Sequence, residues 1–125
     1  MLDIGKIIED HGKWLRQEGG KQADLRLKNL RGINLRGADL RYSILRWADM
    51  EGADFTGADM TGSDIRDSCL MGAILVGANL SDVDLRGANM TNSDITMANI
   101  TGADMSWVKL DGAKLDMAIF INKRG

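Results

Sequence analysis

Few side chains in this sequence are of the types that do chemistry at an active site, and they lack the pattern that such a site needs. His11 is the only histidine among 125 residues, and Cys69 is the only cysteine. A single histidine has no companion for a shared metal ion, and a single cysteine makes neither an internal disulfide nor a cysteine-type zinc site. The aspartates are spread along the chain instead of converging. We therefore expect no catalytic, cofactor-binding or metal-binding residue, and we expect that the protein is not an enzyme.

Two sets of side chains could instead contact a partner. Arginine recurs at intervals of twenty residues, and two tryptophans are sixty residues apart. Exposed tryptophan is a favoured interface anchor, although a tryptophan on a flat surface can also be a local cover. The candidate partner surface consists of Arg26, Arg46, Arg66, Arg86, Trp47 and Trp107.

The fold must position these residues, and a pattern that repeats every five residues predicts what that fold is. Every fifth residue from Leu25 to Phe120 is apolar, without exception in twenty positions. Ala or Ser stands two residues before the apolar residue in sixteen repeats, and Asp or Asn stands between them in fourteen. Repetition this strict indicates a stack of short units that can bury their apolar side chains only together.

A period of five excludes a continuous helix or strand. Five residues of an α-helix turn through about 500°, so the apolar residues would spread around the whole cylinder. In a strand, an odd repeat would send successive apolar residues to opposite faces. The chain must therefore bend once per repeat, with Asp or Asn pointing outward and two residues at each corner. Gly occupies the second corner position in ten repeats and supplies the conformational freedom of a tight turn.

This pattern resembles that of the pentapeptide repeat family, A-[DN]-L-X-X, over residues 23–122, as in Ala38-Asp39-Leu40 and Ala78-Asn79-Leu80. The resemblance implies an all-β solenoid, a right-handed quadrilateral β-helix with one pentapeptide per face and four faces per coil. Twenty repeats then make about five coils, and residues twenty apart lie above one another at the ~4.8 Å spacing of paired strands. Residues 1–22 are expected to form an N-terminal helical cap, and residues 123–125 a C-terminal tail.

The cap is predicted to be an α-helix within residues 3–18. Asp3 can cap its start, and Gly19-Gly20 can end it. His11 is expected to be partly buried against Trp14. Such a helix would cover an open edge of stacked strands. Helical spacing is followed by Ile4, Ile7, Ile8, His11, Trp14 and Leu15.

The C-terminal end departs from the repeat. Ile119 and Ile121 take outward positions that are usually Asp and Thr. One interpretation is that they fold over the open end of the core. The other is an end-to-end homodimer, like the C-terminal dimers of gyrase-protecting members of the family that the pattern resembles. The candidate dimer end consists of Met117, Ile119, Phe120 and Ile121.

The four-faced map places the arginine column beside outward aspartates. Arg66 and Arg86 share repeats with Asp64 and Asp84, which favours a charge-balanced ladder over an anion-binding stripe. Cys69 replaces the usual Asp or Asn and is expected to be exposed. Arginine also occupies the same position in the first five repeats, which predicts a basic collar around the first coil: Arg26, Arg31, Arg36, Arg41 and Arg46.

Charge is distributed unevenly along the chain. Residues 1–46 hold ten Lys/Arg and six Asp/Glu (+4), residues 47–105 hold two and ten (−8), and residues 106–125 hold four and two (+2). The first ten residues include Asp3, Glu9 and Asp10 and lack the basic and then apolar pattern of a signal sequence. No run of eighteen apolar residues occurs. We expect a soluble, cytoplasmic protein that does not enter a membrane.

The functional interpretation follows from these features. We expect a non-catalytic protein-interaction or structural module, with a protein partner that the sequence does not identify. The alternative, implied by the resemblance to the quinolone-protecting members of the family, is a DNA mimic that modulates a DNA-binding enzyme such as a type II topoisomerase. The acidic middle segment and the possible dimer favour it. Nucleic-acid binding through the basic collar is a minor variant and is not expected.

Overall fold

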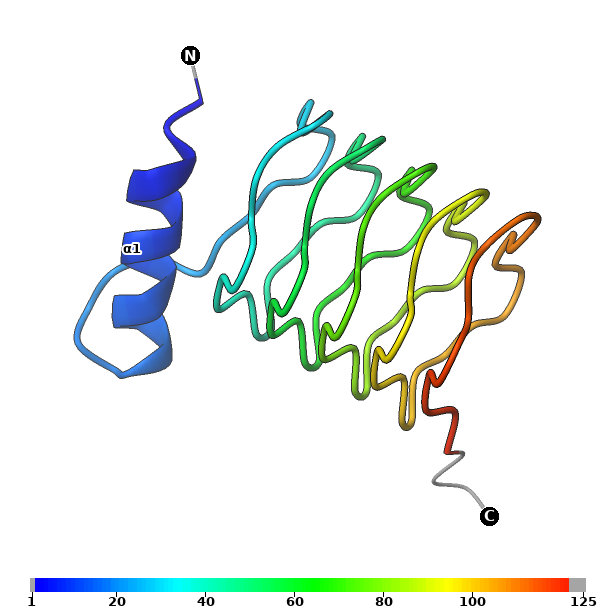
Figure 1. Ribbon diagram of the computed structural model, residues 1–125. Helices are drawn as coiled ribbons and strands as arrows, with labels where there is room; N and C mark the ends of the chain where they lie inside the picture. The colour runs from blue at the N-terminus through cyan, green and yellow to red at the C-terminus, as the bar shows by residue number, and fades with distance from the viewer. Residues whose placement is uncertain (1, 122–125) are drawn as a thin grey trace.

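The computed structural model describes residues 2–121 of the chain. A single α-helix, α1 (Ile4–Leu15), precedes a β-helix solenoid in which the chain winds in regular coils, one above the next (Figure 1). We define the coils by residue number as 23–42, 43–62, 63–82, 83–102 and 103–121. Within residues 2–121, no helix is both long and apolar enough to cross a membrane.

The coils are joined by parallel β-bridges, one per pentapeptide and each between residues twenty apart. The series runs from Asp24 with Ile44 to Asn99 with Ile119. Each bridge is isolated, because the chain turns a corner every five residues and leaves only a short extended segment on each face. The predicted stacking of residues twenty apart is therefore confirmed, although the faces are too short for regular strands among the described residues.

Each corner is a turn with an unusual backbone angle. The N–H after the corner donates to the carbonyl of the central apolar residue, as from Ala53 to Met50 at 3.0 Å. All nineteen second corner positions from residue 27 to residue 117 have positive φ, and ten of them are Gly. This left-handed conformation costs a residue with a side chain roughly 1 kcal/mol. Gly62 is also needed for space, because the ring of Tyr42 from the coil below packs onto it.

The outward Asp or Asn has a structural role that its exposed position does not reveal. Its side-chain oxygen accepts a hydrogen bond from the backbone N–H two residues further on, as Asp54 does from Thr56 at 2.9 Å. The hydroxyl of Thr56 donates to the same oxygen at 2.6 Å. This Asx-type turn satisfies the first corner N–H and explains why Asp and Asn dominate this position.

Helix α1 covers the start of the solenoid. Asp3 is its N-cap and accepts from the N–H of Lys6 at 3.1 Å. Its apolar face, made by Ile4, Ile7 and Ile8, packs against the buried core. The helix ends at Leu15 and not at residue 18, because the chain already turns over residues 16–18 before it reaches Gly19 and Gly20.

His11 joins α1 to the first coil and is fully buried, so the prediction of partial burial was wrong. Its Nδ1 accepts from the N–H of Ala23 at 2.9 Å, and its Nε2 lies 2.7 Å from the carbonyl oxygen of Arg41. Since Nδ1 accepts, Nε2 must be the protonated nitrogen that donates to Arg41, and the ring is the neutral tautomer. Its stacking on Trp14, with ring centroids 5.5 Å apart, is as expected.

The core is a column of central apolar side chains inside the coils. From Leu25 to Ile100 every one of these side chains is buried, and Ala or Ser two residues earlier lets the walls approach. Three buried serine hydroxyls, those of Ser43, Ser63 and Ser93, have no hydrogen-bond partner among the described residues. The predicted tail, residues 123–125, and the last repeat residue, Asn122, lie outside the described residues.

Candidate functional site

The C-terminal end of the solenoid has the largest concentration of uncovered apolar side chains. Met117 is 80% exposed and Ile121 is 59% exposed, and Ile119 and Phe120 are also exposed. Leu115, a central residue of the repeat, is 39% exposed, whereas its counterparts in the earlier coils are buried. The structure thus brings all four residues of the predicted dimer end together with Leu115, which the sequence analysis did not select.

The backbone at this end is also open. In the earlier coils the N–H groups of the central and second corner residues donate to the coil above, as from Gly102 to Ile121 at 2.9 Å. The equivalent N–H groups of Leu110, Gly112, Leu115 and Met117 have no acceptor within residues 2–121. Apolar side chains beside unpaired N–H groups form an edge that a further β-structure can extend.

The predicted arginine column is present on one face as an ion-pair ladder. Arg46 binds Asp64 of the next coil at 2.7 Å, and Arg66 binds Asp64 at 2.9 Å and Asp84 at 3.5 Å. Arg86 continues the series with Asp84 at 2.7 Å and Asp104 at 3.8 Å. In the first coil, Arg26 binds Asp24 at 2.6 Å. Each of the four column arginines therefore has a carboxylate partner, as a charge-balanced ladder requires.

Hydrogen bonding sets the acidity of the ladder. The Arg66 guanidinium, and after it Arg46, holds the pKa of Asp64 far below the ordinary carboxyl value, against the opposing effect of burial. A hydrogen bond from Arg26 lowers the pKa of Asp24 in the same way. The carboxylates are thus charged and occupied, which leaves the ladder little capacity to bind a free anion or cation.

The predicted basic collar is neutralised, so its interpretation as a basic surface was wrong. Arg31 contacts Glu51 at 2.5 Å, Arg36 contacts Asp54 at 3.1 Å, and Arg41 contacts Asp39 at 2.7 Å. These pairs form because the fold places carboxylates of the same and the next coil beside each guanidinium. The count of charges by segment could not show this pairing.

The two tryptophans project from the same edge of the solenoid. Trp47 is 51% exposed, and the guanidinium of Arg46 lies 5.8 Å from its ring centroid. Trp107 is 87% exposed. Trp47 therefore has a partial local cover, whereas Trp107 presents nearly its whole side chain. Their role in binding a partner remains a prediction.

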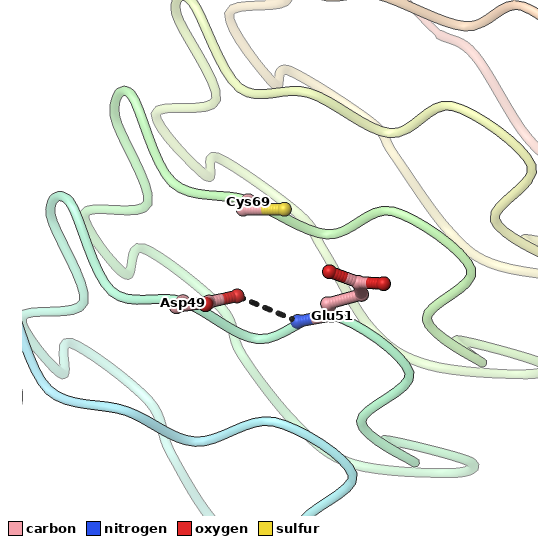
Figure 2. Close-up of side chains that lie close together, drawn as sticks. All are labelled: Asp49, Glu51 and Cys69. Carbon is pink, nitrogen blue, oxygen red and sulfur yellow. Dashed lines mark hydrogen bonds between the residues drawn. The ribbon is translucent and has the colours of Figure 1, made fainter.

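Asp49, Glu51 and Cys69 place three possible metal ligands within 4.8 Å of one another (Figure 2). The two carboxylates already bind Arg31, through Asp49 at 3.6 Å and Glu51 at 2.5 Å, and Asp49 also accepts from the N–H of Glu51. Cys69 is half-buried instead of exposed as predicted. Carboxylates neutralised by a guanidinium do not make a metal site, and we assign none here.

One further feature was missed by the sequence analysis. A groove of about 350 Å³ opens where the first two coils meet, lined by Asp24, Arg26, Leu27, Lys28 and Trp47. Its signal in the sequence was Leu27, a large apolar residue at a corner position where Gly is most common. Only the stacking of the first two coils places Leu27 under Trp47.

Comparison with known protein families identifies a repeat family. The model of pentapeptide repeats matches residues 21–57, 45–77 and 78–116, with eight copies. Together these ranges cover more than half of the chain. A comparison with curated proteins gives no match.

Solved structures share the fold. The pentapeptide repeat protein Rfr23 from the cyanobacterium Cyanothece 51142 is 28% identical over 82% of this chain and 67% of its own, with a TM-score of 0.66. HetL from Nostoc sp. strain PCC 7120, described as involved in heterocyst differentiation regulation, is 23% identical over 79% of this chain, with a TM-score of 0.55. The match spans only 58% of the length of HetL. QnrB1, a plasmid-mediated fluoroquinolone resistance protein, matches at 15% identity and a TM-score of 0.30, which is too low to support an argument about function.

Proposed function

The chain belongs to the pentapeptide repeat family, and from this premise we propose that it is a non-catalytic protein-interaction module of the cytoplasm. Its scaffold is the right-handed quadrilateral β-helix of about five coils expected from the sequence. A scaffold without loop insertions offers flat faces and two ends for contact, and each face within residues 2–121 is crossed by ordered polar side chains.

The C-terminal end is the surface through which the module assembles, and the observation that carries this proposal is the exposure of its apolar side chains. Met117, Ile119, Phe120 and Ile121 lie together beside backbone N–H groups that have no acceptor within residues 2–121. A second copy of the chain supplies a matching apolar surface and the same unpaired edge. We infer a homodimer in which two C-terminal ends meet.

The covered N-terminal end determines what kind of assembly this is. Helix α1 and His11 cover the first coil, so one copy cannot stack its C-terminal end onto the start of the next copy. A head-to-tail contact would build a filament, whereas a contact between two identical ends is closed by a two-fold axis. The expected product is a dimer and not a fibre.

Analytical ultracentrifugation tests this proposal. The wild-type chain of 13.7 kDa is expected to sediment as a dimer at micromolar concentration, and Ile121→Lys as a monomer, because the lysine places a charge in the contact. Leu27→Lys is the matched control, since it makes the same kind of change at an exposed site at the opposite end and should leave the dimer intact. A monomeric wild type, or a dimeric Ile121→Lys, contradicts the proposal.

A second candidate is the DNA mimic, favoured by the charge of −8 over residues 47–105. The ion pairs oppose it, because seven of the ten carboxylates in this segment contact an arginine. DNA presents a continuous line of unpaired negative charge that such a surface does not reproduce. A gyrase supercoiling assay with increasing protein tests this candidate. Absence of inhibition, protection or binding at tens of micromolar, which is roughly the weak end of protein–protein affinity, excludes it.

A further inference from the structure

The groove between the first two coils combines an apolar floor with a cation that has no ion-pair partner. Leu27 is 74% exposed and lies below Trp47, and both line the groove. Arg26 and Asp24, also in its wall, bind each other at 2.6 Å. Lys28 makes no ion pair within residues 2–121. The net charge of the wall is therefore positive, and its source is Lys28.

The charge of the groove contrasts with that of the neighbouring face. On the ladder each arginine is held by carboxylates, and the pKa of Asp24 is lowered by its hydrogen bond with Arg26. Asp24 is thus already engaged by Arg26 in a two-point contact through Nε and the terminal nitrogen, at 2.9 and 2.6 Å. Lys28 acts on Asp24 only through Coulombic attraction and makes no ion pair within residues 2–121, so an incoming carboxylate can pair with it directly.

The groove has two large apolar side chains at corner positions where Gly is the most common residue. Leu27 and Trp47 have φ of 63° and 61°, a conformation that Gly adopts without strain at ten other corners. Tyr42 has the same strained conformation, but its ring packs onto Gly62 and so stabilises the fold. Leu27 has no such packing, because most of its side chain is in solvent. The large apolar side chain of Leu27 is therefore available for contact with a partner.

We propose that this groove docks a segment of a partner protein in which an acidic side chain stands beside an aromatic or aliphatic one. The apolar side chain packs between Leu27 and Trp47, and the carboxylate pairs with Lys28. The proposal deepens the function proposed above by naming the chemistry of a partner. It concerns the end opposite the dimer contact, so its failure leaves the dimer proposal untouched, and the reverse also holds.

Two short peptides that differ only in charge test the proposal. One has an aspartate on each side of a Leu-Phe pair, and the other has lysines at the same places. NMR titration follows the indole N–H signals of the three tryptophans in the ¹⁵N-labelled protein, assigned with Trp47→Phe. The acidic peptide is expected to shift the Trp47 signal in a saturable way and to leave the Trp107 signal in place, and the basic peptide is expected to bind about tenfold more weakly.

Charge reversal in the protein completes the test. Lys28→Glu is expected to weaken binding of the acidic peptide about tenfold and to favour the basic peptide, since an attraction becomes a repulsion. Lys109→Glu is the matched control in the last coil and should leave binding unchanged. The proposal is overturned if neither peptide moves the Trp47 signal, if both bind equally, or if Lys28→Glu has no effect while its spectrum shows an intact fold.

Discussion

At the N-terminal end of the solenoid, α1 covers the first coil, and Leu35 is 3% exposed. At the C-terminal end, Leu115 occupies the same face and the same place in the repeat but is 39% exposed, because no described element lies over it. Figure 1 shows the helix beside the first coil, at one end of the stack, and no second helix in the coloured ribbon at the last coil. The repeat thus builds equal coils, and the position of a coil in the stack decides whether its apolar side chain stabilises the fold or remains available for contact.

The largest effect is expected from truncating these two equivalent leucines. Leu35→Ala should lower the free energy of unfolding by about 3 kcal/mol, because it leaves a cavity in a closed core. Leu115→Ala should cost less than about 1 kcal/mol, because much of that side chain is already in water. Urea unfolding in the Ile121→Lys background, which keeps the chain monomeric, measures both. Equal losses would show that the two ends are covered equally in solution.

His11 tests what holds the covered end closed. His11→Ala removes the acceptor of the Ala23 N–H and the donor to the Arg41 carbonyl, both at a buried site. We expect a loss of about 2 kcal/mol in urea unfolding, together with weaker protection of the α1 amides in hydrogen exchange. Lys6→Ala, at an exposed position of the same helix, is the control and should change stability little. A His11→Ala protein as stable as wild type would mean that α1 is held by its isoleucines alone.

Lowering the pH is expected to reduce the difference in stability between the two ends. This effect should be smaller than the effects of the substitutions at Leu35 and His11. Arg31, Arg36 and Arg41 link the first coil to carboxylates of the second, whereas Arg86 links the fourth coil to Asp104 of the last coil. Hydrogen bonds from Thr56, and then from Arg36, lower the pKa of Asp54.

The lowered pKa of Asp54 determines how the stability of the first two coils changes with pH. A carboxylate whose pKa is lower in the folded state stabilises the fold fully above its ordinary pKa of about 4, and the stabilisation is lost as the pH falls toward the folded value. Hydrogen-exchange protection in the first two coils should therefore decrease between pH 6 and pH 3 more than protection in the last coil. Asp64→Asn should reduce the acid sensitivity of the middle coils. Equal decreases along the solenoid would contradict this account.

The smallest effect is expected away from both ends. Ser43 in the second coil and Ser93 in the fourth have buried hydroxyls with no hydrogen-bond partner within residues 2–121. Ser43→Ala and Ser93→Ala should each raise the free energy of unfolding by about 1 kcal/mol, because an unsatisfied buried hydroxyl is removed and Ala is the common residue at this place. Thermal unfolding should show similar gains for both. A gain at Ser43 alone would mean that the openness of the C-terminal end extends as far as the fourth coil.

Much of the scaffold was predictable because the order of residue types within one repeat determines where the chain turns and which side chains point inward. The five-residue register predicts the corners, the inward Leu and the stacking of residues twenty apart, and all three are observed. The Asx turn was also within reach, since Asp and Asn are typical turn residues whose side chains bind the backbone two residues further on. The end of α1 was less predictable, because the left-handed residue that ends the helix is Gln17 and not a glycine, and the N–H of Glu18 donates to the carbonyl of Lys13 at 2.9 Å.

The surface was predictable only in part. The sequence places Arg46 and Arg66 in one column, but which carboxylate each arginine binds depends on side-chain reach between coils. Arg36 illustrates the point, since it belongs to a predicted basic collar yet contacts Asp54 of the next coil. A charge count along the chain treats Arg36 and Asp54 as separate charges. In the fold they form an ion pair and neutralise each other.

The sequence by itself determined the repeat, the inward core and the candidate ends, because these follow from the order of residue types at a spacing of five. The tertiary structure alone decided which groups remain free: the exposed Leu115 and Met117 at one end, and Lys28 beside Leu27 and Trp47 at the other. The physical reason is that pairing and burial depend on what lies twenty residues away and on what covers the stack, and neither is a property of any single repeat.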